Sequence, residues 1–204
     1  MAVVGRYSPS RVREKLLEDS WVFTNSGMTV VRPSSIVFSG ATASITPNGS
    51  VSFSAVDSLS LNGVFTSAYD NYMVVVGGNS SDDGGNLSVR LRTGSTDASG
   101  SNYTYQVLAA SSTSVTAARA SSTYTRLVLL DDSDKGGGTA YIYGPFLSQP
   151  TAFRGVSVGG GSVTFMRDFA ATHSLSTSYE SMTIFNETSG QTLTGLISVY
   201  GLGG

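Results

Sequence analysis

The stretch Leu61–Gly77, LNGVFTSAYDNYMVVVG, decides the fold class of this chain. It begins as a turn-prone segment in which Phe65 is the large apolar residue among serine, aspartate and asparagine. It ends in Tyr72–Val76, a short aromatic and β-branched run that glycine closes. Such a run, apolar on both faces, is typical of a buried strand in the middle of a sheet. We therefore expect Tyr72–Val76 to be a central strand with further strands beside it.

Short apolar runs separated by glycine, asparagine and aspartate continue this pattern to the end of the sequence. In Asn86–Arg92, three aliphatic residues alternate strictly with one serine and two arginines, which predicts a strand buried on one face. Thr151–Val158 and Ser162–Phe169 predict a hairpin across three glycines. Ala109–Ser122 is small and polar, and an exposed excursion is expected there.

Strands at this spacing predict an all-β fold: a jelly-roll-like antiparallel β-sandwich with a short N-terminal helix. The sandwich is expected over residues 34–204, and residues 1–33 are expected to form an N-terminal arm and attachment helix. Ser8 and Pro9 are a helix start signal, and the segment after them holds the single helical pattern of the sequence. The alternative is a helix that packs on its own sandwich. The expected attachment residues are Val12, Leu16, Leu17 and Trp21.

The composition excludes several classes of function. Charged residues make up 13% of the 204 residues, well below the usual share of about 25%, and the formal net charge is −2. Binding to nucleic acid needs a basic patch, and none is present. The absence of cysteine excludes disulfides and thiolate metal sites. We find neither the h-region of a signal peptide nor an apolar run near 18–20 residues, so synthesis in a cytoplasm and no membrane span are expected.

No catalytic constellation is visible in the sequence. His173 is the one histidine, and no G-x-S-x-G elbow accompanies it, so a loop or surface position is expected. A histidine-rich zinc site is excluded. Asp82–Asp83 and Asp131–Asp134 are oxygen-rich segments of the kind that can hold Ca²⁺, but their spacing departs from the EF-hand and fits solvated turns. We therefore expect neither an enzyme nor a cofactor or metal.

Three long polar loops, residues 79–86, 94–102 and 131–138, are the segments expected to be presented to a partner. Tyrosines in polar strands, such as Tyr103, are typical of carbohydrate and protein recognition surfaces, because the ring stacks and the hydroxyl forms hydrogen bonds. The alternative is that these tyrosines line the sandwich. The candidate host-contact residues are Asp82, Asp83, Asn102, Tyr103, Asp131, Asp132 and Asp134.

Three segments in fixed order carry a family resemblance: Phe65–Tyr72 (FTSAYDNY), Leu87–Gly94 (LSVRLRTG), and Ser178–Phe185 followed by Leu193–Gly201 (LTGLISVYG). Together they resemble β-sandwich proteins of tailed bacteriophages that serve as minor tail, fibre or receptor-binding proteins. The shared patterns are F-x-S-x-Y-x-N-Y, R-L-R-x-G and G-x-I-x-V-Y-G. The resemblance covers residues 35–201 and leaves out the N-terminal helix.

The resemblance implies a virion protein, commonly a homotrimer, that is made in the host cytoplasm and then joins the particle. It implies no reaction and supplies no binding residues. We expect the N-terminal region to contact other phage virion proteins and the loops to meet a host cell-wall glycan. A capsid decoration or head-fibre protein is the alternative within the virion class. A tail-associated polysaccharide depolymerase is the enzymatic alternative, and it would need two carboxylates in a groove.

Overall fold

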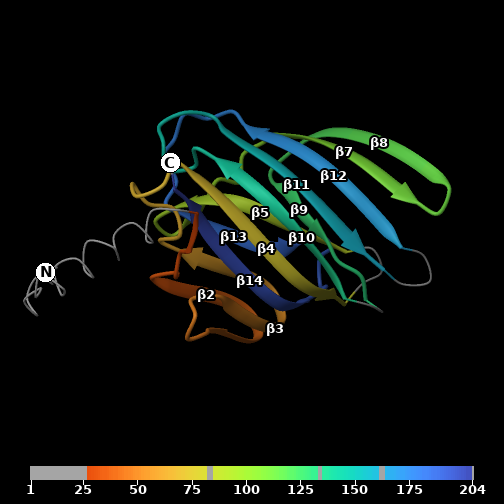
Figure 1. Cartoon of the computed structure of the whole chain (residues 1–204), viewed down its shortest axis with the longest axis horizontal. Helices are drawn as coiled ribbons and strands as arrows, with labels where there is room; N and C mark the ends of the chain where they lie inside the picture. The colour runs from red at the N-terminus through yellow and green to blue at the C-terminus, as the bar shows by residue number, and fades with distance from the viewer. Residues whose placement is uncertain (1–26, 82–84, 133–134, 161–163, 204) are drawn as a thin grey trace, which may run out of the picture.

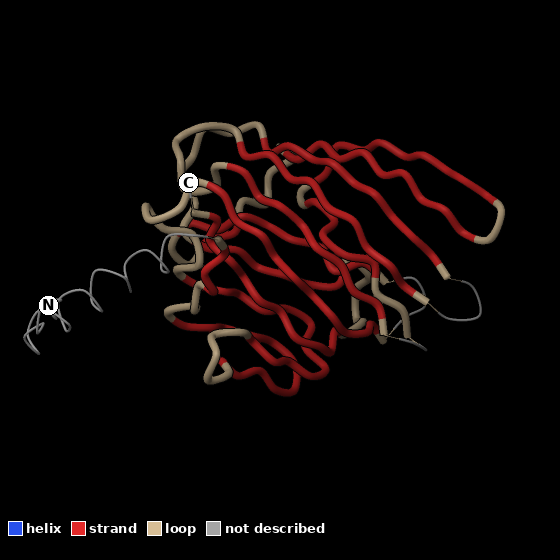
Figure 2. The backbone as a smooth tube through the Cα atoms, viewed as in Figure 1, coloured by secondary structure: helices blue, strands red, loops and turns tan. Residues whose placement is uncertain are grey.

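The computed structural model describes residues 27–81, 85–132, 135–160 and 164–203, and strands make up most of them (Figures 1 and 2). No helix occurs among these residues, and the predicted helix with Val12, Leu16, Leu17 and Trp21 lies outside them. The strands are β1 (Met28–Val30), β2 (Ser35–Ile45), β3 (Val51–Asn62), β4 (Asn71–Ser80), β5 (Asn86–Thr93), β6 (Thr96–Asp97), β7 (Tyr103–Ser111), β8 (Ser114–Ser122), β9 (Thr125–Leu129), β10 (Gly136–Tyr143), β11 (Thr151–Gly159), β12 (Phe165–His173), β13 (Ser181–Asn186) and β14 (Leu193–Leu202).

All the strand pairs are antiparallel and join into one sheet. The order is β6-β5-β13-β3-β14-β4-β10-β11-β12-β7-β8, with β1 on β14, β2 on β3 and β9 on β5. The all-β prediction is confirmed. Tyr72–Val76 lies in β4 between β14 and β10, as predicted for a central strand. The predicted hairpin is β11 paired with β12.

Strand β3 is where the sheet turns. Residues 51–56 of β3 pair with β14, whereas residues 58–61 pair with β13. Strands β14 and β13 therefore pair with different parts of β3. The pairing of β2 with β3 shifts at Ser39 and Gly40, opposite Ala55, whose φ is 47°. Gly40 has a φ of 109°, and a Cβ there would collide with the carbonyl oxygen of Ala55. Only glycine fits this bulge without strain.

Because of this turn, the sheet curls over and encloses one core (Figure 1). Strand β9, which pairs with β5, packs across the core against β10, β11, β12 and β7. Burial of their apolar side chains is the main stabilising term of such a fold. The largest fully buried side chains come from both halves of the sheet: Leu59, Leu61, Phe65, Tyr72, Leu87, Leu91, Tyr103, Leu127, Leu130, Ile142, Met182 and Ile184.

Two segments differ from the sequence expectation. Gly136–Gly138, expected within a presented loop, begins strand β10. A Cβ on Gly136 would lie 2.9 Å from the carbonyl oxygen of Leu129, so glycine lets β9 pass close to β10. Residues 109–122, expected as an exposed excursion, are indeed mostly exposed or half-buried, but they form the regular hairpin of β7 and β8 that extends from the body in Figure 1.

Candidate functional site

The three predicted loops do not share one rim. The described parts of 79–86 and 131–138 meet at one end of the sheet, where the Ser80 N–H donates to the Asp131 carbonyl at 3.0 Å. The register places residues 94–102 at the opposite end. There the Ser174 N–H donates to the carbonyl of Asn102 at 3.0 Å. One partner therefore cannot contact all three loops of a single chain at the same edge.

Two of the predicted contact residues are inside the protein. Tyr103 is fully buried, and its hydroxyl accepts a hydrogen bond from the Leu91 N–H at 2.9 Å. Burial raises the pKa of Tyr103 well above its usual range. Asp131 is 1% exposed. Neither side chain is offered at the surface that the structure describes, so the expectation that they contact a host is wrong for the single chain.

The other predicted contact residues have mixed positions. Asp132 is exposed and Asn102 is half-buried. Asp82, Asp83 and Asp134 lie outside the described residues. Across the described ranges, no group of three or more histidine, aspartate or glutamate side chains could hold a metal ion. None of the described segments is a helix long and apolar enough to cross a membrane.

His173 is also buried, contrary to the expected surface position. Its ring lies 4.4 Å from the ring of Tyr103 and 5.3 Å from that of Tyr179, measured between centroids. Neither ring nitrogen has a hydrogen-bond partner, and burial lowers the pKa of His173. A neutral histidine enclosed by two tyrosines is part of the core packing and has no access to a substrate.

A polar groove lies elsewhere, on the side of β3, β13 and β5 that faces away from the core. Its volume is about 430 Å³, and residues 188–191 close one side of it. In β5 the aliphatic residues point inward and are fully buried, as the alternation predicted. Arg90 and Arg92 consequently point outward into the groove, where Thr183 of β13 and Ser60 of β3 lie beside them.

The floor of the groove is a connected hydrogen-bond network. Arg92 forms an ion pair with Asp97 at 2.8 Å, and its Nε donates to the carbonyl of Gly94 at 3.2 Å. The Thr183 hydroxyl donates to the same Asp97 oxygen at 2.7 Å, and it lies 2.9 Å from the hydroxyl of Ser60. These contacts fix the side chains before any ligand arrives, which reduces the entropic cost of binding.

An aromatic ring and a cation form the wall beside this floor. The Arg90 guanidinium lies over the ring of Phe185, 4.5 Å from its centroid. Its Nε donates to the carbonyl of Thr123 at 3.1 Å, and the ring of Tyr124 meets Phe185 edge-on at 5.5 Å. Arg90 is therefore held in place by stacking and by a hydrogen bond, and its planar group has donors that these contacts do not use.

The groove offers donors, acceptors and an aromatic ring within one small hollow. Few polar groups at fixed positions around an aromatic residue are the usual make-up of a small-molecule or sugar site. Two carboxylates, Asp57 and Asp97, line it. Asp97 is engaged by Arg92 and Thr183, and Asp57 accepts a hydrogen bond from Ser39 at 3.0 Å. Both carboxylates thus have partners within the protein.

The sequence analysis identified the face of β5 that carries Arg90 and Arg92 but did not propose it as a site. Two arginines at positions i and i+2 on an otherwise low-charge strand were the signal available. Thr183 and Phe185 come from a distant part of the chain, and the pairing of β5 with β13 brings them to the arginines. Asp97 lies five residues after Arg92 and is held beside it by the pairing of β5 with β6.

Comparisons with known proteins add no functional assignment. No protein-family model matches the chain, and no curated protein matches it. Among solved structures, a protein of unknown function from Shewanella oneidensis MR-1 is 10% identical and covers 98% of this chain and 97% of its own, with a TM-score of 0.23. A Lotus tetragonolobus seed lectin is 11% identical and covers 86% of this chain and 98% of its own, with a TM-score of 0.22. Likenesses of this size carry no argument about function.

Proposed function

We propose that the chain is a structural protein of a tailed-bacteriophage virion, of the minor tail or fibre type. In this proposal its N-terminal region attaches to the particle, and a jelly-roll-like sandwich, assembled as a homotrimer, meets a glycan of the host surface. The three sequence motifs support the virion role. The observation that supports recognition of a glycan is the polar groove between β3, β13 and β5. No reaction is proposed.

The chemistry of the groove fits a polar polymer. Each sugar hydroxyl both donates and accepts hydrogen bonds, so a sugar site needs both kinds of group. Arg90 and Arg92 donate, Asp57 and Asp97 accept, and Phe185 provides an apolar surface beside them. The hollow of about 430 Å³ has the size of small-ligand pockets, which range from about 300 to 1,000 Å³.

Replacing Arg90 with alanine is expected to weaken binding to fragments of the host cell wall by about tenfold to a hundredfold. The reason is that a hydrogen bond from a charged group contributes about 1.5–3 kcal/mol. The measurement is a pull-down titration of the purified full chain on the wall fragments. Arg119→Ala is the matched control, because Arg119 is an exposed arginine on β8, outside the groove.

Equal binding by the wild type and Arg90→Ala would contradict the role of the groove. A filled groove provides a second variant: Ser58→Tyr places a large side chain among the lining residues without removing a charge. It should also weaken binding. New reducing ends in the wall material would instead support the depolymerase alternative, and Asp57→Asn and Asp97→Asn would then be compared.

A further inference from the structure

One side of the curled sheet exposes apolar side chains that the fold leaves uncovered. Strands β14, β4, β10, β11, β12, β7 and β8 lie next to one another, and the side that they turn away from the core is called the outer face here. The strand registers align its side chains in rows across the strands. Leu196, Val158, Met166 and Val115 share one row. Val75, Val156 and Leu108 share the next.

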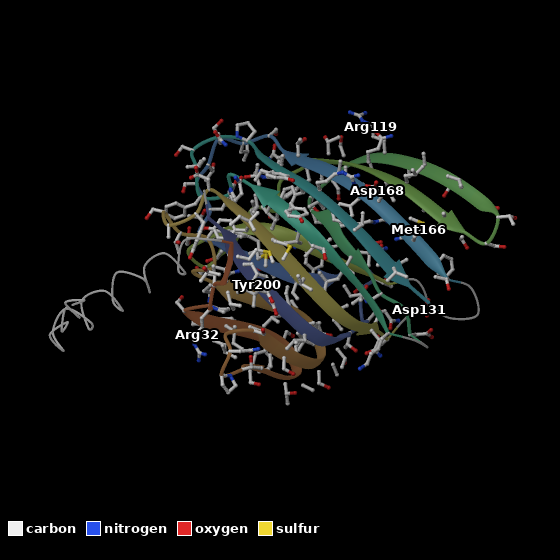
Figure 3. All side chains as sticks on the ribbon, in the orientation of Figure 1. Arg32, Arg119, Asp131, Met166, Asp168 and Tyr200 are labelled. Carbon is white, nitrogen blue, oxygen red and sulfur yellow. The ribbon has the colours of Figure 1, made fainter. Side chains whose placement is uncertain are left out.

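These seven side chains are between 37% and 68% exposed. A strand with one side in water normally alternates apolar and polar residues, as β5 does. Here the outward positions are apolar as well. The charged residue within the two rows is Asp168, which forms an ion pair with Arg154 from the adjacent row. Figure 3 shows Met166 and Asp168 on β12, beside the β7–β8 hairpin. These two rows are thus largely apolar and close to electrically neutral, whereas the third row of the outer face holds Arg154, Gln106 and Arg119 beside Met73, Tyr141 and Tyr200.

The surface of the outer face is not flat. Between Leu196 and Val158 the row passes through Gly77 and Gly137, which have no side chains. A Cβ on Gly77 would meet nothing within 4 Å. This furrow continues into a hollow of about 410 Å³ between Val75 and Met166. A ridge formed by Val156, Val158 and Met166 therefore lies beside a furrow at Gly77 and Gly137.

The area of the outer face is close to, and somewhat below, that of one side of a standard interface between two proteins. Seven strands about 4.8 Å apart span about 29 Å, and three rows about 6.8 Å apart span about 20 Å with their side chains. The product is on the order of 600 Å², before side-chain relief is added, whereas a stable interface buries about 800 Å² on each partner. An apolar patch of about 300–600 Å² is the largest that a typical monomer exposes, and such a patch is often functional.

We infer that a second copy of this chain covers the outer face. A ridge beside a furrow is self-complementary, because a two-fold axis places the ridge of each copy in the furrow of the other. Two apolar sheet faces pack at about 10 Å, as within a β-sandwich. The groove belongs to β3, β13 and β5, so this contact leaves it open. This two-fold contact joins chains in pairs, so it is separate from the three-fold contact that the proposed homotrimer needs, and it does not rest on the virion role.

The double variant Val158→Asp with Met166→Asp is expected to weaken self-association of the full chain at least about a hundredfold. Two charges would have to leave water in an apolar contact. Sedimentation equilibrium across a range of concentrations measures this. Val37→Asp is the matched control: Val37 is 57% exposed on β2, outside the outer face. A monomeric wild type, or equal association of the double variant, would overturn the inference.

A second measurement keeps the inference testable if the charged variant fails to fold. The chain has no cysteine. The double substitution Gly77→Cys with Val158→Cys places one cysteine in the furrow and one on the ridge, so it should give a disulfide-linked pair of chains after mild oxidation, and Val37→Cys should not. Crosslinking at Val37 alone would place the contact elsewhere. Wall binding measured on the same samples separates the proposed glycan recognition from the proposed interface. Association without wall binding would contradict the recognition function and would still support the interface.

Discussion

Replacing Tyr103 with alanine is expected to lower the free energy of unfolding by about 3–5 kcal/mol, the usual cost of deleting a large buried ring. Tyr103 is fully buried at the start of β7. Its ring packs at a tilt against the ring of His173, and its hydroxyl accepts the hydrogen bond of the Leu91 N–H. The substitution removes the ring, leaves a cavity and deprives a buried N–H of its partner.

Chemical denaturation of the purified chain measures this loss. Tyr143→Ala is the control, because Tyr143 is 40% exposed on β10, and its stability change should be much smaller. If Tyr103 instead contacted the host, the alanine variant would keep wild-type stability and lose binding. That result would contradict the placement of Tyr103 in the core.

Replacing Glu187 with alanine is expected to cost about 3 kcal/mol, at the lower end of the range for breaking a buried ion pair. Glu187 follows β13 and accepts two hydrogen bonds from Arg126 of β9, at 2.9 and 3.0 Å. It also accepts one from the side chain of Asn86 of β5 at 2.5 Å. The Glu187 side chain is 14% exposed, so its charge is poorly hydrated.

This cluster holds the two halves of the curled sheet together. Arg167 of β12 donates to Asn86, and Arg126 lies 5.3 Å from the ring centroid of Tyr105 of β7. Burial lowers the pKa of Arg167, and the positive charge of Arg126 lowers it further. Without Glu187, two half-buried arginines would remain with no carboxylate between them.

Urea unfolding of Glu187→Ala, with Asp57→Ala as the control, measures this contribution. Asp57 is exposed and has a hydrogen bond to Ser39, so its removal should change stability by less than about 1 kcal/mol. The replacement Glu187→Gln should recover part of the loss, because the amide still accepts from Arg126. Equal stability of the Glu187→Ala variant and the wild type would contradict the bridging role.

The local pattern of the sequence was sufficient for the fold class. The β-branched content of Tyr72–Val76 and the alternation in Asn86–Arg92 each predicted a strand, and the structure confirms both. These signals depend on neighbours within a few residues. The curl of the sheet depends instead on the contact of Gly40 with Ala55 and on the change of partner along β3, which alternation does not encode.

The same limit explains why the sequence did not predict the burial of two candidate site residues. Tyr103 and His173 looked like surface residues because their neighbours in sequence are polar. Their environment is set by Leu91 and Tyr179, which the sheet brings to them. The opposite error concerns Val75: its apolar neighbours in sequence predicted a buried side chain, yet it is 37% exposed on the outer face. The valine run predicted a strand buried on both faces, whereas one side of it is partly exposed in the single chain.

The central claim, that the chain is part of a phage particle, has a direct test. Phage particles would be induced or propagated from the source of this gene, purified by density gradient and analysed by quantitative mass spectrometry. The account predicts that the chain bands with the particles in a fixed ratio to the tail or capsid proteins, and immunogold labelling would then distinguish the tail from the head. A chain that is abundant in the lysate but absent from the purified particles would contradict it.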